Sequence, residues 1–103
     1  MLEFLKKLFG GVSVNFKELI TKGAIIVDVR SNSEYKAGHI PGSKNFPLDT
    51  IQTKVAELKK LNKPVITVCR SGSRSGMAKG ILKSAGIEVY NGGPWTSLKN
   101  KIA

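Results

Sequence analysis

Apolar and polar positions alternate along the chain with two different periods, one typical of strands and one typical of helices. Two short runs dominated by apolar, β-branched residues, AIIVDVR at 24–30 and PVITVC at 64–69, predict buried strands. Between them, apolar residues from Leu48 to Leu61 recur in steps of three and four, which predicts an amphipathic helix. This order favours a three-layer α/β domain, with helices on both faces of a mostly parallel sheet.

Capping and turn residues divide the rest of the first half into shorter elements. A short strand is expected at 13–15, followed by a helix at 16–23 with Asn15 as its N-cap. A second short helix is expected at 31–38, with Gly38 at its end. The two prolines of the segment that follows disfavour helix in the residues before them, so a turn and a brief extended piece are expected there.

The second half repeats the alternation. A helix at 72–86 is predicted to turn Met77, Ile81 and Leu82 toward the core. The chain then closes with three expected elements: a strand at 87–90, a turn at 91–94, and a helix that contains Trp95 and Leu98.

The first twelve residues differ from the rest. Residues 1–12 are interpreted as a short amphipathic segment that packs on the domain or on a partner, with membrane-surface binding as the alternative. Its apolar side chains stand at helix-like spacing: Leu2, Leu5, Leu8 and Phe9. Residues 13–103 have the size of one domain with one core.

The net charge of +10, from 17 Lys and Arg against 7 Asp and Glu, attracts anions over a long range. The basic residues are dispersed and follow no nucleic-acid-reading motif, so we expect a solvated basic surface and no nucleic-acid partner. The longest apolar run, AIIV, is far shorter than the roughly 18 residues of a membrane span. No secretion signal is recognised, and we expect a cytoplasmic, monomeric protein without a transmembrane segment.

One cysteine and one histidine supply the chain's thiol and imidazole groups. A single cysteine cannot form an internal disulfide, which agrees with a reducing compartment. One Cys and one His also cannot make a closed metal site, so no metal is expected. The cysteine therefore stands out as a candidate nucleophile.

Cys69 ends a predicted buried strand, and the helix predicted after it would point unpaired amides and its positive end at the sulfur. Gly72 can take the positive φ that turns successive amides inward. Arg70 and Arg74 add two fixed positive charges suited to oxyanions. Small hydroxyl side chains leave the mouth of the loop open: Ser71, Ser73 and Ser75. An ordinary thiol is only about 3% ionised at pH 7, and this surrounding predicts a lowered pKa.

The loop resembles the active-site loop of the rhodanese family of sulfurtransferases. DVRSNSEYKAGHIPGSKNFP at 28–47 is similar to the family's Asp-Val-Arg, Glu-Tyr, Gly-His-Ile, Gly-Ser and Asn-x-Pro signature. YNGGPWTSL at 90–98 is similar to its closing Gly-Gly and Trp element. The resemblance covers about residues 13–99. It implies a rhodanese domain at 13–103, with a three-layer rhodanese-like fold and a mostly parallel five-stranded sheet.

The resemblance also implies an activity. Cys69 would take sulfane sulfur from a small anionic donor such as thiosulfate, and would hold it as a persulfide. No cofactor is implied, and the residues that would bind the substrate are those of the loop: Arg70, Ser71, Gly72, Ser73, Arg74 and Ser75. Because no second cysteine exists, the acceptor must come from outside: cyanide in an assay, a thiol or a protein in the cell.

Two other functions stay open on the same fold. Phosphatases and some arsenate reductases have five residues between the Cys and the Arg of this loop, whereas four separate Cys69 from Arg74. A smaller ring suits one sulfur atom better than a tetrahedral oxyanion, which favours sulfur transfer. The other alternative is a persulfide-carrier or interaction module with little turnover, whose basic surface docks an acidic partner.

Four further residues are candidates for supporting roles, and the sequence does not tell whether they touch the substrate. His39 is interpreted as a hydrogen-bonding loop histidine, and Arg30 as a local ion-pair partner of Glu34. Asp28 is expected to accept backbone N–H bonds. Trp95 is expected to pack in the core or at its rim, with a place in the pocket wall as the alternative.

Overall fold

A parallel sheet with strand order β2-β1-β3-β4 organises residues 14–103, the part of the chain that the computed structural model describes. Its strands are β1 (Ile25–Asp28), β2 (Lys44–Asn45), β3 (Val65–Cys69) and β4 (Val89–Pro94). The helices are α2 (Phe16–Thr21), α3 (Asn32–Ala37), α4 (Ile51–Leu61), α5 (Ser73–Ser84) and α6 (Trp95–Ile102), with a 3-10 turn, η1 (Leu48–Thr50), before α4.

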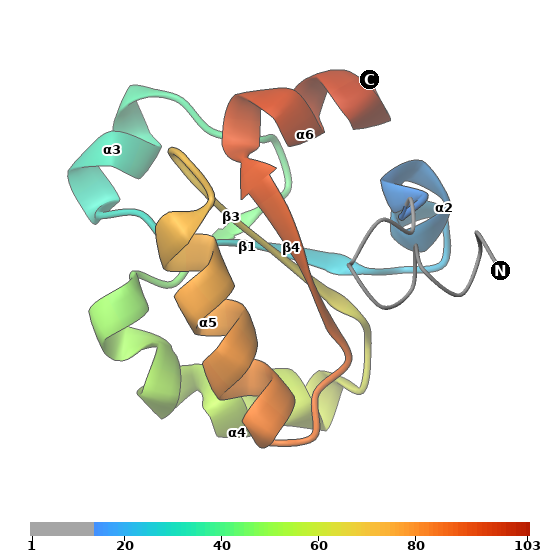
Figure 1. The fold of residues 1–103 in the computed structure, drawn as a ribbon, viewed down its shortest axis with the longest axis vertical. Coiled ribbons are helices and arrows are strands. Elements are labelled where there is room, and N and C mark those ends of the chain that lie inside the picture. Colours follow the sequence, from blue (N-terminus) through green and yellow to red (C-terminus); the bar gives the residue numbers. More distant parts are fainter. Residues whose placement is uncertain (1–13) are drawn as a thin grey trace, which may run out of the picture.

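Helices cover both faces of this sheet, as the alternating pattern predicts (Figure 1). Helices α4 and α5 pack on one face through buried side chains: Ile51, Leu58, Ala78 and Leu82. Helices α2 and α6 pack on the other through Phe16, Leu19, Ile20, Leu98 and Ile102. Successive side chains of β3 point to opposite faces, so Val65 and Cys69 join the first cluster and Ile66 and Val68 the second. The three-layer α/β prediction is confirmed.

The described residues form four strands, and the predicted count of five is wrong for them. Val14 and Asn15 belong to no strand, and Ser13 lies outside the described residues. Asn15 instead caps α2, because its Oδ1 accepts the amide of Glu18 at 3.0 Å. The predicted amphipathic segment at 1–12 also lies outside the described residues.

Helix α5 buries a different face from the predicted one. Met77 is 60% exposed, whereas Ser75, Ala78 and Leu82 are fully buried. Small side chains at 75 and 78 let the helix lie close to the sheet, and in that position Met77 points to solvent. The prediction of an inward Met77 is therefore wrong, whereas Leu82 is inward as predicted.

The predicted turn at 91–94 is also wrong, because β4 continues through it. Thr67 of β3 pairs with Asn91 and Val68 pairs with Gly93, which leaves Gly92 as the extra residue of a β-bulge. A Cβ at Gly92 would lie 2.9 Å from side-chain atoms of both Ile66 and Val68. Glycine therefore lets β4 follow β3 to its end and brings Asn91 close to the loop after Cys69.

Among residues 14–103, none of the helices has the length and hydropathy that a membrane crossing requires.

Candidate active site

Cys69 is the last residue of β3 and is fully buried. Helix α5 begins four residues later, at Ser73, with Gly72 as its N-cap. Gly72 has φ 99°, the positive value that the sequence predicts for this position. The loop therefore folds the chain back over the sulfur and aims the first amides of the helix toward it.

Two groups lie within hydrogen-bonding distance of the Cys69 sulfur. The Gly72 amide donates to Sγ at 2.9 Å, and the Ser75 hydroxyl lies 3.3 Å from it. Burial raises the pKa of the thiol, but the Ser75 hydroxyl and the amides of Ser75, Gly72 and Ser71 lower it further than burial raises it. The net effect is a pKa below the ordinary thiol value, in line with the expectation from the sequence.

Asn91 connects the bulge of β4 to this loop. Its Oδ1 accepts the Ser75 hydroxyl at 2.6 Å and the Gly93 amide at 2.9 Å. Its Nδ2 donates to the Gly72 carbonyl at 3.2 Å. Sequence reasoning missed Asn91. The available signal was its place near the carboxyl end of the strand beside the Cys69 strand, directly before two glycines.

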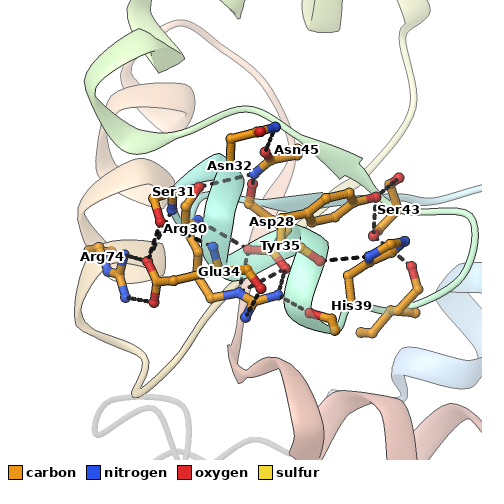
Figure 2. Close-up of polar contacts among 12 residues, drawn as sticks. Asp28, Arg30, Ser31, Asn32, Glu34, Tyr35, His39, Ser43, Asn45 and Arg74 are labelled. Carbon is orange, nitrogen blue, oxygen red and sulfur yellow. Dashed lines mark hydrogen bonds and ion pairs between the residues drawn. The ribbon is translucent and has the colours of Figure 1, made fainter.

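Arg74 faces helix α3 through a two-point ion pair with Glu34 (Figure 2). Arg74 Nη1 lies 2.7 Å from Glu34 Oε1, and Nη2 lies 3.0 Å from Oε2. The same carboxylate accepts the amide and the hydroxyl of Ser31. Ser31 Oγ accepts the Glu34 amide in return, and these reciprocal bonds make the capping box at the start of α3. The hydrogen bonds from Arg74 first, and then those from Ser31, hold the pKa of Glu34 well below its usual range.

Arg30 does not pair with the Glu34 carboxylate, so that prediction is wrong. Its guanidinium binds both oxygens of Asp28, with Nε–Oδ1 at 2.9 Å and Nη2–Oδ2 at 2.7 Å (Figure 2). Arg30 contacts Glu34 only through the backbone carbonyl, at 3.3 Å. Asp28 also accepts the Arg30 amide at 3.0 Å, as predicted for a carboxylate that binds backbone N–H groups. Arg30 binds Asp28 because the two side chains are buried next to each other, whereas the Glu34 carboxylate lies on the side of α3 that faces Arg74.

Arg70 differs from Arg74. Arg70 is exposed, and within the described part of the chain its side chain makes no hydrogen bond or ion pair. The exposed residues Ser71 and Ser73 flank Gly72 on the same surface. The loop therefore presents one unpaired guanidinium beside Cys69 and one that is bound to a carboxylate.

His39 and Trp95 lie in supporting positions. The His39 ring stacks on Tyr35 with centroids 3.8 Å apart, and its Nδ1 lies 2.8 Å from the Tyr35 carbonyl (Figure 2). Trp95 packs against the core cluster of α2 and α6, and its ring lies 4.7 Å from the Arg30 guanidinium carbon. His39 is a hydrogen-bonding loop histidine, as predicted, and Trp95 packs at the rim of the core.

Residues 14–103 contain no group of three or more His, Cys, Asp or Glu side chains placed to hold a metal ion. The chemistry that the described site can supply is that of a buried thiol under amide donors, beside two arginines. Such a site can form a thiolate and hold a negatively charged group.

The chain is similar in sequence and in fold to several known proteins. The chain is 38% identical to the thiosulfate sulfurtransferase GlpE of Pseudoalteromonas translucida, over 72% of this chain and 71% of the relative. It is 38% identical to the putative sulfur carrier protein YrkF of Bacillus subtilis, over 61% of this chain and 34% of the relative. A solved structure titled rhodanese with anions from E. coli matches with a TM-score of 0.67 and 31% identity, over 73% of this chain and 91% of that one.

Several curated relatives are longer than this chain, and the chain spans 54%, 34% and 18% of three of them. The Rhodanese-like domain family matches residues 14–94, from the residue before the N-cap of α2 to the end of β4. This match covers most of the chain and includes both the loop after Cys69 and the Gly-Gly bulge. The chain belongs to the Rhodanese-like domain family.

Proposed function

We propose that the protein is a sulfurtransferase that carries sulfane sulfur on Cys69. The Cys69 thiolate attacks the outer sulfur of thiosulfate, the S–S bond of the donor breaks, and sulfite leaves with the bonding electron pair. An external thiolate then attacks the outer sulfur of the persulfide, and the Cys69 sulfur leaves as thiolate. The observation that carries the proposal is the buried sulfur that receives the Gly72 amide at 2.9 Å.

The amide donors support both states of the cycle. A thiolate and a terminal persulfide sulfur are both negative, and the backbone N–H groups of the loop can donate hydrogen bonds to either. The pKa of Cys69 is lowered by Ser75, Gly72 and Ser71 against the opposing effect of burial. The thiolate fraction near neutral pH is therefore larger than that of an ordinary cysteine.

The two arginines support an anionic donor in different ways. Arg70 is exposed and free to meet the sulfonate of thiosulfate and the departing sulfite. Arg74 keeps its charge near Cys69 while Glu34 holds its guanidinium. We therefore assign donor capture mainly to Arg70, and to Arg74 a fixed positive charge beside the sulfur.

Access to the sulfur depends on the loop. Cys69 is fully buried, so we expect that a donor reaches Sγ only when the loop around it moves. The outer sulfur of a persulfide needs room in the same place. Loading with sulfur is thus expected to alter the loop without altering the sheet beneath it.

The acceptor is proposed to be an external thiol or a protein, since Cys69 is the chain's only cysteine. A carrier role with little turnover is the second candidate, favoured by the name of the Bacillus subtilis relative, a putative sulfur carrier protein. The two roles share the loading step and differ in the second step. A carrier would pass sulfur to one protein partner much faster than to cyanide or to small thiols.

Intact mass after incubation with thiosulfate tests the proposal. The protein is expected to gain the mass of one sulfur atom, and a small thiol added afterwards should remove it. Cys69→Ser, which changes a single atom type, is the matched control and should gain nothing. If the wild-type protein gains no sulfur from thiosulfate or any other sulfane donor, the proposal is wrong. Faster turnover of an aryl phosphate or of arsenate would instead support the oxyanion alternative.

A further inference from the structure

The amide of Asn91 has its orientation fixed by two backbone groups. The Gly93 N–H can only donate, so the atom 2.9 Å from it is the carbonyl oxygen Oδ1. The Gly72 carbonyl can only accept, so the atom 3.2 Å from it is the amide nitrogen Nδ2. The two contacts agree, and a flipped amide would oppose like groups at both places.

This orientation fixes the hydrogen of the Ser75 hydroxyl. Ser75 Oγ lies 2.6 Å from Asn91 Oδ1, and an oxygen acceptor at that distance requires the hydroxyl to donate to it. A serine has one hydroxyl hydrogen. Ser75 therefore cannot donate to Cys69 Sγ, 3.3 Å away, at the same time. In this arrangement Ser75 Oγ can accept the S–H of a Cys69 thiol.

We propose that Asn91 is a positioning residue that holds the Ser75 hydroxyl away from Cys69 in the thiol state and releases it to the sulfur when the sulfur becomes negative. Ser75 then turns its hydrogen from Oδ1 to the thiolate or the persulfide, and Asn91 Oδ1 keeps the Gly93 N–H. This inference rests on the proposed function, because that function supplies the negative sulfur.

Two acceptors, Asn91 Oδ1 and the Cys69 sulfur, compete for the one hydroxyl hydrogen of Ser75, and this competition affects how readily the sulfur ionises. The thiolate gains a hydrogen bond from Ser75 only by breaking the short one to Asn91. Asn91 therefore opposes ionisation through Ser75. At the same time its Nδ2 holds the Gly72 carbonyl, which keeps the Gly72 amide turned toward the sulfur. Only the first of these two effects requires the Ser75 hydroxyl.

Among the described residues, no charged side chain of another residue is hydrogen-bonded to the Asn91 or Ser75 side chain. Arg74 on α5 is paired with Glu34 on α3, and Asp28 at the end of β1 is paired with Arg30. Arg70 follows the cysteine directly. The switch between Asn91 and Ser75 involves neutral groups alone, so changing either residue alters no formal charge near the sulfur.

A double-mutant cycle isolates the effect that passes through Ser75. Thiolate absorbance in the ultraviolet, with Cys69→Ser as blank, gives the acidity of Cys69 without any need for a reagent to enter the loop. Asn91→Leu keeps the branched shape of the side chain and removes the acceptor. The acidity of Cys69 is compared between Asn91→Leu and the wild type, and then between the double variant and Ser75→Ala. The second comparison retains any effect through the Gly72 carbonyl and lacks the effect through the Ser75 hydroxyl.

We expect Asn91→Leu to make Cys69 more acidic in the presence of Ser75, by about 2- to 10-fold relative to its effect in Ser75→Ala, the range for one hydrogen bond. The proposal would be overturned if Asn91→Leu changed the acidity of Cys69 equally with and without the Ser75 hydroxyl. It would also be overturned if Asn91→Leu made Cys69 less acidic only when Ser75 is present. Circular dichroism checks folding, and Asn91→Ala replaces the leucine variant if that one is unfolded.

Sulfur loading, read by intact mass, is measured on the same proteins. Coupling between Asn91 and Ser75 without loading by any donor would keep the positioning role and reject the proposed function. Sulfur loading without coupling between Asn91 and Ser75 would support the proposed function and reject the positioning role of Asn91.

Discussion

Glu34 on α3 and Arg74 on α5 form a two-point ion pair across 40 residues of sequence, with distances of 2.7 and 3.0 Å. The pair joins the capping box of α3 to the first turn of the helix that follows Cys69. One carboxylate thus caps one helix and holds the arginine of the other. Within residues 14–103, Arg70 is then the guanidinium of the loop without an ion-pair partner, and the first prediction follows from that difference.

Arg70→Ala is expected to raise the KM for thiosulfate more than Arg74→Ala does. Loss of an anchor that binds the donor equally in the ground and transition states raises KM and leaves kcat nearly unchanged. For one charged hydrogen-bonding group, we expect KM to rise by about tenfold. Steady-state rates over a range of thiosulfate concentrations provide the measurement. Lys63→Ala, which removes one positive charge before the opposite end of β3, controls for net charge. A larger KM change in Arg74→Ala would show that Glu34 releases this arginine to the donor.

Glu34→Gln is expected to reduce the loss of folding stability that occurs when the pH is lowered. The pKa of Glu34 in the folded protein lies below its unfolded value, chiefly through Arg74. Such a group stabilises the fold fully above the unfolded pKa, near 4.3, and loses that contribution as the pH falls toward the folded pKa. Urea midpoints at neutral and acidic pH should therefore differ less in the variant than in the wild type. The same difference in both proteins would contradict the prediction.

Arg30→Leu is expected to destabilise the fold by about 3–5 kcal/mol, because it leaves the buried carboxylate of Asp28 without its partner. Urea unfolding gives the free energy. Lys22→Ala breaks the exposed ion pair with Glu18 and should leave the midpoint almost unchanged. Replacing Asp28 and Arg30 together by apolar residues should recover part of the loss. If Arg30→Leu alone behaves like Lys22→Ala, the buried pair does not have the role assigned to it.

Gly92→Ala is expected to destabilise the protein by about 1–3 kcal/mol through overpacking at the bulge of β4. The added Cβ would lie 2.9 Å from Ile66 and Val68 and 3.0 Å from the Thr67 carbonyl. Gly80→Ala is the matched control, since a Cβ there meets nothing within 4 Å and the residue lies inside α5. The control should stabilise the protein by up to about 1 kcal/mol. Thermal unfolding compares the two, and a neutral Gly92→Ala would argue against a tight bulge.

Much of the fold could be predicted because its signals are local. The β-branched runs at β1 and β3, the stepwise apolar residues of α4, and the glycine at position 72 act through nearby backbone and side chains. The limits of local reasoning appear at Met77. Its spacing to Ile81 fits a buried face, but the small residues Ser75 and Ala78 determine which face of α5 meets the sheet.

The chain's sequence by itself determined the alternation of strands and helices and the thiol at a strand end before a glycine-bearing loop, since periodicity and backbone freedom are properties of neighbouring residues. Only the tertiary structure decided that Glu34 binds Arg74, that Arg30 binds Asp28, and that Asn91 reaches Ser75. Each of these choices selects among several partners of suitable chemistry. Side-chain positions in the folded protein make the selection, even for Arg30 and Asp28, which are two residues apart in the sequence and are both buried.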